Sequence, residues 1–269
     1  MIELLESNIR TNDRKSSKGN QLKWLRNERW YKADYTGYEG LAEYVVSCFL
    51  RRSTLKEDQF VVYRTEEMSY KGQRFLGCSS PHFLHNGEQL VTWERLYQQT
   101  SGRSLQADVF QFPSVPDRLA FLTGQMERAS GLTGIMDYLA ALFVVDAVFL
   151  NEDRHMHNLA FVLDDSGTYH FCPLFDHGGC LLSDTTLEYP LGGDIHRLAK
   201  DVMGRTVSHS LDEQLDLVEE IRPDSLKFNL SRSDAEQMIR DEPYYSAEIK
   251  SRVTEIVSMQ MRKYSYLFI

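Results

Sequence analysis

The order of apolar and polar residues divides the chain into two parts of different character. Up to roughly residue 90, bulky apolar positions mostly alternate with polar ones, a period of two that is typical of β-strands. Farther along, apolar positions recur every three or four residues, as they do in amphipathic helices. The pattern predicts an α+β protein with a small, mainly β part over residues 1–80 and a larger helical part over residues 81–269.

The first part should contain four strands and one helix. The helix is predicted over GYEGLAEYVVSCFLRR (37–52), where Leu41, Val45 and Phe49 fall on one face. The strands are predicted at QLKWL, ERWYKADY, QFVVYRTEEM (59–68) and QRFLGCSS (73–80).

The second part should consist mainly of helices. Its window IMDYLAALFVVDAVFL (135–150) is the most apolar of the chain, but it carries Asp137 and Asp146 and is too short to span a bilayer. We therefore expect a buried helix there. Asp146 within it is equally consistent with a buried acid that has a polar partner and with a catalytic group. Helices are predicted over 92–100, 116–129, 133–150, 211–220, 232–240 and 245–266.

One β-hairpin is predicted within the helical part. NLAFVLDD and TYHFCPLFD are strand-like, and DDSGT between them has the residue composition of a tight turn. If the hairpin is centred near Ser166 and Gly167, Asn158 faces about residue 175 or 176. Asn158 and Asp176 should then lie side by side, next to Asp153 at the end of the preceding helix.

Composition and charge exclude several classes of protein. The formal charge of the 269 residues is -9, which argues against a general nucleic-acid-binding protein because such a protein needs a basic face for phosphates. The four cysteines are far apart, so neither a disulfide framework nor a zinc–cysteine site is expected. The first residues lack the pattern of a signal peptide. These features predict a cytoplasmic protein.

The hairpin gathers groups that suit phosphate chemistry. A carboxylate and an amide oxygen that lie close together form a good binding site for Mg²⁺, and Asp176 and Asn158 would supply them. Asp153, five positions before Asn158, is placed to orient a hydroxyl. This spacing, followed by a metal-binding aspartate, is the arrangement of protein-kinase active sites.

A kinase also needs a cation on the phosphates, and the first part of the chain offers one. Lys32 lies in a predicted strand, and Glu39 and Glu43 share one face of the helix that follows, so either carboxylate could hold it. The preceding turn, SSKGNQLK (16–23), is suited to covering the phosphates of a nucleotide. Glu39 also fits a solvated charge at the start of the helix.

These segments resemble those of HipA-like serine/threonine kinases. NEDRHMHNLAF resembles their N-x-D-x-H-x-x-N-x-x-F catalytic segment, and YKADYTGYEGLAEYVVSCFL resembles their lysine strand and following helix. SSKGNQLK is similar to their S-x-x-G-x-Q-x-K phosphate loop at Ser16, Gly19, Gln21 and Lys23. The D-R-H-x-x-N form is shared with phosphatidylinositol 3- and 4-kinases.

The resemblance implies a two-lobed protein-kinase-like fold and an ATP- and Mg²⁺-dependent serine/threonine protein kinase. It implies that Asp153 is the catalytic base and that Asn158 and Asp176 bind Mg²⁺. Lys32 would then contact the nucleotide phosphates, with Glu43 as its ion-pair partner.

The resemblance also implies partners and a modification. A protein substrate is expected, together with a regulatory or antitoxin protein of the toxin–antitoxin kind. The chain begins about fifteen residues before the phosphate loop, which matches short members that lack the amino-terminal HipA domain. Ser16 matches a serine that phosphorylates itself in some members. The motif D-H-G at Asp176 departs from the D-F-G of other kinases.

Three other functions compete with this interpretation. One is a phosphatidylinositol-type lipid kinase, although the acidic charge and the lack of a basic amphipathic helix argue against a membrane partner. Another is a non-catalytic nucleotide-binding module. The third is a metal-dependent hydrolase, in which the imidazole and carboxylate groups of Asp153, His155, His157, Asp176 and His177 hold zinc or manganese. In a kinase, His155 would brace the catalytic loop, and His157 would be a structural loop histidine.

Overall fold

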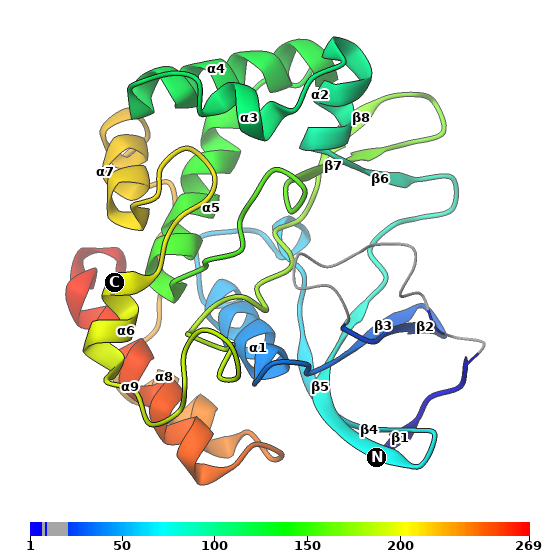
Figure 1. Ribbon diagram of the computed structural model, residues 1–269, viewed down its shortest axis with the longest axis vertical. Coiled ribbons are helices and arrows are strands. Elements are labelled where there is room, and N and C mark those ends of the chain that lie inside the picture. Colours follow the sequence, from blue (N-terminus) through cyan, green and yellow to red (C-terminus); the bar gives the residue numbers. More distant parts are fainter. Residues whose placement is uncertain (7–8, 10–20) are drawn as a thin grey trace.

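The computed structural model describes residues 1–6, 9 and 21–269. A five-stranded sheet with one helix lies at the lower right of Figure 1, and the other helices occupy the top and the left side. This is the predicted α+β, two-lobed arrangement. Ser16 and Gly19 lie outside the described residues.

The five-stranded sheet has the order β1-β4-β5-β3-β2. Its neighbours are antiparallel, except that β1 runs parallel to β4. Helix α1 (Glu39–Leu50) packs against β4 and β5. The strands are β1 (Ile2–Glu3), β2 (Lys23–Arg26), β3 (Arg29–Ala33), β4 (Arg64–Tyr70) and β5 (Gln73–Pro81).

Two glycines allow α1 to lie very close to the sheet. A Cβ atom on Gly40 would lie 2.4 Å from the backbone carbonyl carbon of Gly77. A Cβ atom on Gly77 would lie 2.0 Å from the backbone oxygen of Lys32. A larger residue at position 40 would therefore push the start of α1 away from β5, and one at position 77 would push β5 away from β3, where Lys32 lies.

The rest of the chain is mostly helical and surrounds α5 (Ile135–Phe149), which is buried over most of its length. Five of these helices begin at a serine whose side chain accepts a hydrogen bond from a free backbone N–H of the first turn, namely Ser104, Ser114, Ser210, Ser231 and Ser246. The other helices are α2 (Trp93–Ser101), α3 (Leu105–Val109), α4 (Val115–Ser130), α6 (Ile195–Asp201), α7 (Leu211–Ile221), α8 (Arg232–Asp241) and α9 (Ala247–Lys263).

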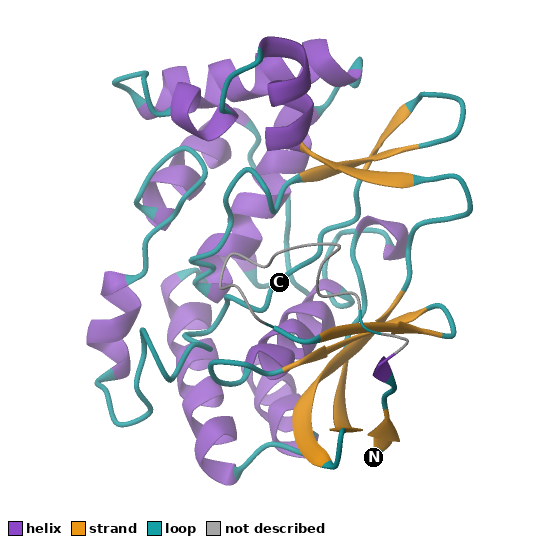
Figure 2. Cartoon of the chain, turned by 45° about the vertical axis from the view of Figure 1, so that its right-hand side comes forward, coloured by secondary structure: helices purple, strands orange, loops and turns teal. Residues whose placement is uncertain are grey.

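A second, three-stranded sheet lies beside the helices (Figure 2). It has the order β6-β7-β8, with β6 (Gln89–Thr92), β7 (Ala160–Leu163) and β8 (Tyr169–Phe171). β7 and β8 form the predicted hairpin, but their register differs from the prediction. Because Asp164 accepts hydrogen bonds from the backbone N–H groups of Ser166 and Thr168, the turn is centred on Ser166 and the pairing is displaced by one to two residues.

The predicted strand 59–68 is also partly wrong. Strand β4 begins only at Arg64, and the 3-10 helix η2 (Glu57–Gln59) precedes it. The residues between them pair with another part of the chain. Leu174 donates to the backbone oxygen of Gln59 (2.8 Å), and Val61 donates to that of Leu174 (2.9 Å). The connection before β4 therefore joins the first sheet to the segment that follows β8.

Two further sequence expectations concern membranes and cysteines. Within the described part of the chain, no helix is both long and apolar enough to cross a membrane. All four cysteines are free thiols.

Asp34 links the turn after β3 to the connection between α8 and α9. Its carboxylate accepts hydrogen bonds from the backbone N–H of Gly40 (2.7 Å) and the hydroxyl of Tyr245 (2.7 Å). Burial, with a contribution from the nearby Glu39 carboxylate, raises the pKa of Asp34 to about 8. Asp34 therefore keeps a proton in the folded protein at pH values where it is ionised in the unfolded chain.

The stability of the protein should respond to this proton. Between about pH 4 and 8 the folded state binds more protons at Asp34 than the unfolded state, so the free energy of unfolding should fall as pH rises through this window. Asp34→Asn should flatten that part of the curve. Urea denaturation of both proteins between pH 5 and 8.5 measures it. The same slope in the two proteins would show that Asp34 does not carry the effect.

Candidate active site

Lys32 lies at the centre of a cluster of charged groups. Its ammonium group is 2.6 Å from the Glu43 carboxylate on α1 and 2.8 Å from the Asp176 carboxylate. The second oxygen of Glu43 accepts a hydrogen bond from the backbone N–H of His177 (2.8 Å). The cluster thus joins β3, α1 and the segment after β8, which are far apart in the sequence.

The charges in this cluster stabilise one another. Burial alone would lower the pKa of Lys32, but Asp176 and Glu43 outweigh it and hold that pKa well above its usual value. Burial alone would raise the pKa of Asp176, but Lys32 and Lys23 hold it below its usual value. Lys32 and Asp176 are therefore a charged pair at neutral pH.

The backbone at Asp176 has an unusual conformation. Its φ angle of 62° lies in the left-handed region, which few residues other than glycine adopt and which costs energy. The backbone N–H of Asp176 donates to the hydroxyl of Tyr63 (3.3 Å), and the ring of Tyr63 lies 5.4 Å from the Lys32 ammonium group. In this conformation the Asp176 carboxylate lies 2.8 Å from the Lys32 ammonium group.

Asp153 and Asn158 are held together in the loop after α5. The side-chain N–H₂ of Asn158 donates to the backbone oxygen (2.7 Å) and the carboxylate (3.2 Å) of Asp153. The backbone N–H of Asp153 donates to the side chain of Asn151 (3.1 Å). A Cβ atom on Gly179 would lie 2.8 Å from that of Asp153, so the segment after Asp176 passes directly against this loop.

Arg154 connects this loop to the segment that carries Asp176. Its buried guanidinium group lies 3.3 Å from both carboxylate oxygens of Asp146 and donates to the backbone oxygens of Phe175 (3.0 Å) and Asn158 (3.4 Å). It also lies 3.3 Å from the His177 ring. Arg154 thus ties the loop that carries Asn158 to the residues on either side of Asp176. Asp146 is a core acid with polar partners.

Breaking the buried pair should destabilise the protein. Asp146→Asn would leave the Arg154 guanidinium group buried without its counter-charge, which should lower the free energy of unfolding by about 3–5 kcal/mol. Glu236→Gln is the control, because it breaks an exposed pair with Arg232 one helix turn away and should cost about 0.5 kcal/mol or less. Urea denaturation measures both. Equal losses would show that the Asp146 charge carries no special weight.

Two other candidate residues, His155 and Glu39, have local roles in the structure. The His155 ring accepts a hydrogen bond from the backbone N–H of His157 (3.2 Å) and lies 3.7 Å from the Asp153 carboxylate, as expected of a bracing residue. Glu39 accepts hydrogen bonds from the backbone N–H groups of residues 35–37, so it secures the turn before α1. Glu43, and not Glu39, is the partner of Lys32.

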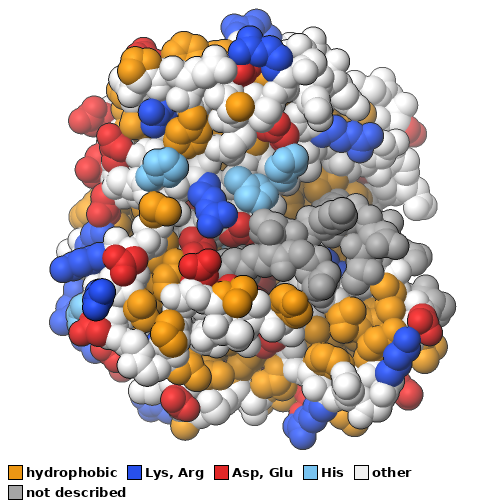
Figure 3. All heavy atoms as spheres, viewed as in Figure 1, with side chains coloured by type: hydrophobic (Ala, Val, Ile, Leu, Met, Phe, Trp, Pro, Cys, Tyr) orange, Lys and Arg blue, Asp and Glu red, His pale blue; other side chains and the backbone are white. Residues whose placement is uncertain are grey.

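Several of these groups line a cleft. On the face shown in Figure 3, acidic, histidine and basic side chains gather near the centre of the molecule. The cleft is lined by Gln21, Lys23, Tyr35, Glu39, Glu43, Asp153, Asp176, Gly178, Gly179 and Ser183. Four of these are predicted site residues, namely Gln21, Glu43, Asp153 and Asp176. Tyr63 and the contacts of Arg154 were not predicted, because nothing in the sequence near Tyr63 marks it and Arg154 acts through contacts distant in sequence.

Comparisons with known proteins agree with this geometry at the level of the fold. No protein-family model matches the chain, and no curated protein matches it. Among solved structures, the chain is similar to the crystal structure of a Helicobacter pylori proinflammatory kinase, CtkA, with a TM-score of 0.63. The match covers 97% of this chain and 95% of the other, at 16% sequence identity. The chain has a kinase-like fold.

The surroundings of His177 do not support the hydrolase interpretation. His177 is buried against the Arg154 guanidinium group, and burial together with that positive charge lowers the pKa of His177 well below its usual value. A cation beside the ring opposes the binding of a second cation there. Among the residues that the structure describes, no group of three or more His, Cys, Asp or Glu side chains is arranged to hold a metal ion.

Proposed function

We propose that the protein is an ATP- and Mg²⁺-dependent serine/threonine protein kinase of the HipA-like type, which transfers the γ-phosphoryl group to a protein hydroxyl. One observation carries this proposal. In a kinase-like fold, the Lys32 ammonium group contacts Glu43 and Asp176 at once, beside the loop that pairs Asp153 with Asn158. Phosphoryl transfer depends on positioning and charge, and these groups supply both.

Asn158 and Asp176 have the donor atoms that Mg²⁺ requires. Because the N–H₂ of Asn158 donates to Asp153, its side-chain oxygen is directed away from Asp153. Asp176 is ionised, so the two residues offer a carboxylate and an amide oxygen, the hard ligands that Mg²⁺ prefers. When bound there, Mg²⁺ would neutralise charge on the nucleotide phosphates.

Lys32 would act on the nucleotide, and Asp153 would act on the substrate hydroxyl. Lys32 is held by the buried Glu43, so its ammonium group is fixed beside the cleft, where it would bind the phosphates of ATP. The Asp153 carboxylate lines the same cleft and would orient the substrate hydroxyl and accept its proton. The hydrogen bonds from Asn158 restrict where that carboxylate can point.

The proposal also covers the phosphoryl acceptor and the protein partners. The resemblance of the motifs favours a protein hydroxyl, and a regulatory or antitoxin protein as partner, in the cytoplasm. The acceptor is tested by incubating the protein with γ-labelled ATP and Mg²⁺, with either lysate proteins or phosphatidylinositol vesicles. Label on proteins supports the proposal. Label on the lipid alone would make the protein a lipid kinase, and release of free phosphate alone would indicate a hydrolase.

We also expect the protein to phosphorylate itself at Ser16, with Ser17 as the alternative. The phosphate group would carry about two negative charges at neutral pH and repel the phosphates of ATP, so nucleotide binding and activity should fall. Ser16→Ala should stay active longer, and Asp153→Asn should remain unmodified. Mass spectrometry of residues 1–23 after incubation with ATP and Mg²⁺ decides this. Active wild-type protein without phosphate there would rule out such a switch.

A further inference from the structure

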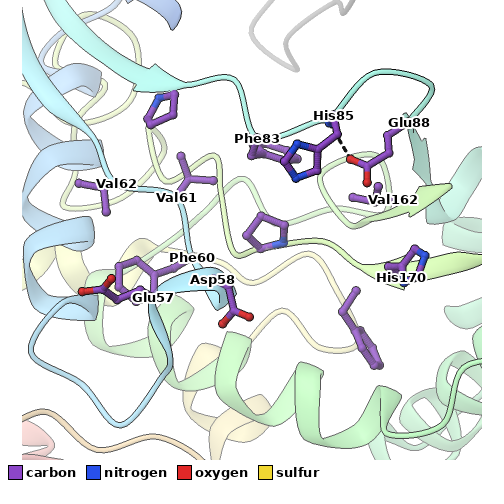
Figure 4. A pocket seen from close by; sticks show the side chains of 13 residues that line it. Glu57, Asp58, Phe60, Val61, Val62, Phe83, His85, Glu88, Val162 and His170 are labelled. Carbon is purple, nitrogen blue, oxygen red and sulfur yellow. Dashed lines mark hydrogen bonds between the residues drawn. The ribbon is translucent and has the colours of Figure 1, made fainter. Parts of the chain in front are cut away.

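A second cavity, of about 400 Å³, lies apart from the cleft (Figure 4). Its walls come from η2 and the residues after it, from the 81–88 connection between the two sheets, and from the β7–β8 hairpin. Among the described residues, none lines both this cavity and the cleft. Its volume is within the range of ligand-binding pockets, roughly 300–1,000 Å³, so the cavity is larger than a packing defect.

The centre of the cavity is apolar, and packing and a backbone hydrogen bond hold its walls in place. Phe83 packs against two apolar clusters, one that contains Val61 and one that contains Val162, and its ring lies 5.7 Å from that of Phe175. The backbone hydrogen bond from Val61 to Leu174 fixes one wall. An apolar group that enters the cavity would therefore meet a preformed surface.

The rim of the cavity is acidic on two sides. Glu57 and Asp58 are exposed on η2, while Glu88 lies beyond the apolar centre, on the 81–88 connection (Figure 4). The backbone N–H of His85 donates to the Glu88 carboxylate (2.7 Å) and fixes its position. As far as the structure describes the chain, neither lysine nor arginine lines the cavity.

We propose that this cavity docks an extended segment of a partner protein, in which an apolar side chain lies between basic residues. The apolar side chain would fill the centre against Phe83 and Val162, and the basic residues would lie on the two acidic sides. The acidic residues lie on two different elements, η2 and the 81–88 connection, and an extended segment can present separate basic residues to each of them. Opposite charges at such a rim would also favour this partner over acidic ones.

Three pools of fluorescein-labelled twelve-residue peptides test the proposal by fluorescence anisotropy. The first mixes Lys and Arg with Leu, Val and Phe, the second replaces the basic residues by Glu, and the third replaces the apolar residues by Ser. Only the first pool should bind the full-length protein saturably. Glu57→Lys combined with Asp58→Lys should weaken this binding about tenfold or more. Val62→Trp, which fills the cavity from its wall, should do the same.

The control is Glu127→Lys combined with Glu220→Lys, the same charge change at exposed positions on α4 and α7, and its binding should match that of the wild type. No saturable binding of the first pool would overturn the proposal. Equal binding of the third pool, or equal weakening by the control, would overturn it too, because attraction would then depend on charge alone. Binding is measured without nucleotide, so the result does not depend on the proposed kinase activity.

Discussion

Asp176→Asn should abolish phosphoryl transfer, by more than about 10³-fold, and should remove the Mg²⁺-dependent part of ATP binding. Asp176 is the ionised group of the proposed Mg²⁺ site and contacts Lys32 directly. Its replacement by a neutral amide would leave the phosphates without their charge partner. Thermal-shift titrations with ATP, in the presence and absence of Mg²⁺, measure the binding part.

A matched control is Asp216→Asn, the same change at an exposed position on α7, which should behave like the wild type. The substitution at residue 176 also removes one of the two carboxylates beside Lys32, so a stability measurement without nucleotide should accompany the titration. If the Mg²⁺-dependent shift with ATP is the same in Asp176→Asn and the wild type, Asp176 does not belong to the nucleotide site.

Asp153→Asn should separate catalysis from binding. ATP affinity should stay close to that of the wild type, while turnover should fall roughly 10²–10⁴-fold, the usual contribution of a general base and of substrate orientation. The physical reason is that Asp153 lines the cleft and its carboxylate accepts a hydrogen bond from Asn158, while Lys32 and Asp176 would hold the nucleotide. ATP titrations and initial rates on one preparation measure the two effects. Joint loss of binding and turnover would instead mark Asp153 as a metal ligand.

Sequence patterns predicted most of the helical part because α5 is a continuous apolar run and the other long helices carry an apolar stripe and start at a capping residue. Helix α4 shows this, with Ser114 as its N-cap and an inward face that includes Leu119 and Leu122. The short helices α3 and α6 were not predicted, since five and seven residues hold too few turns for a period to be visible. The prediction of the hairpin was correct, but its register depended on the hydrogen bonds of Asp164, which no apolar pattern reveals.

The candidate site was predictable as far as its residues lie in short motifs. Asp153 and Asn158 are five positions apart, so their spacing alone suggested a common role. The choice of Glu43 over Glu39 needed the fold, because both were predicted on the same helix face, and the structure places Glu43 against Lys32 while Glu39 binds the turn before α1. The second cavity combines three distant segments, none of which carries a motif.

The central claim is that this chain moves the γ-phosphoryl group of ATP to a protein hydroxyl and that Asp153 is needed for it. The most direct measurement follows γ-labelled ATP with Mg²⁺ in the wild type and in Asp153→Asn, with the labelled residues mapped by mass spectrometry. We predict phosphate on serine or threonine in the wild-type reaction, none without Mg²⁺, and at least about 10²-fold less with Asp153→Asn. Labelling that is equal in the two proteins, or free phosphate without any phosphoprotein, would contradict the claim.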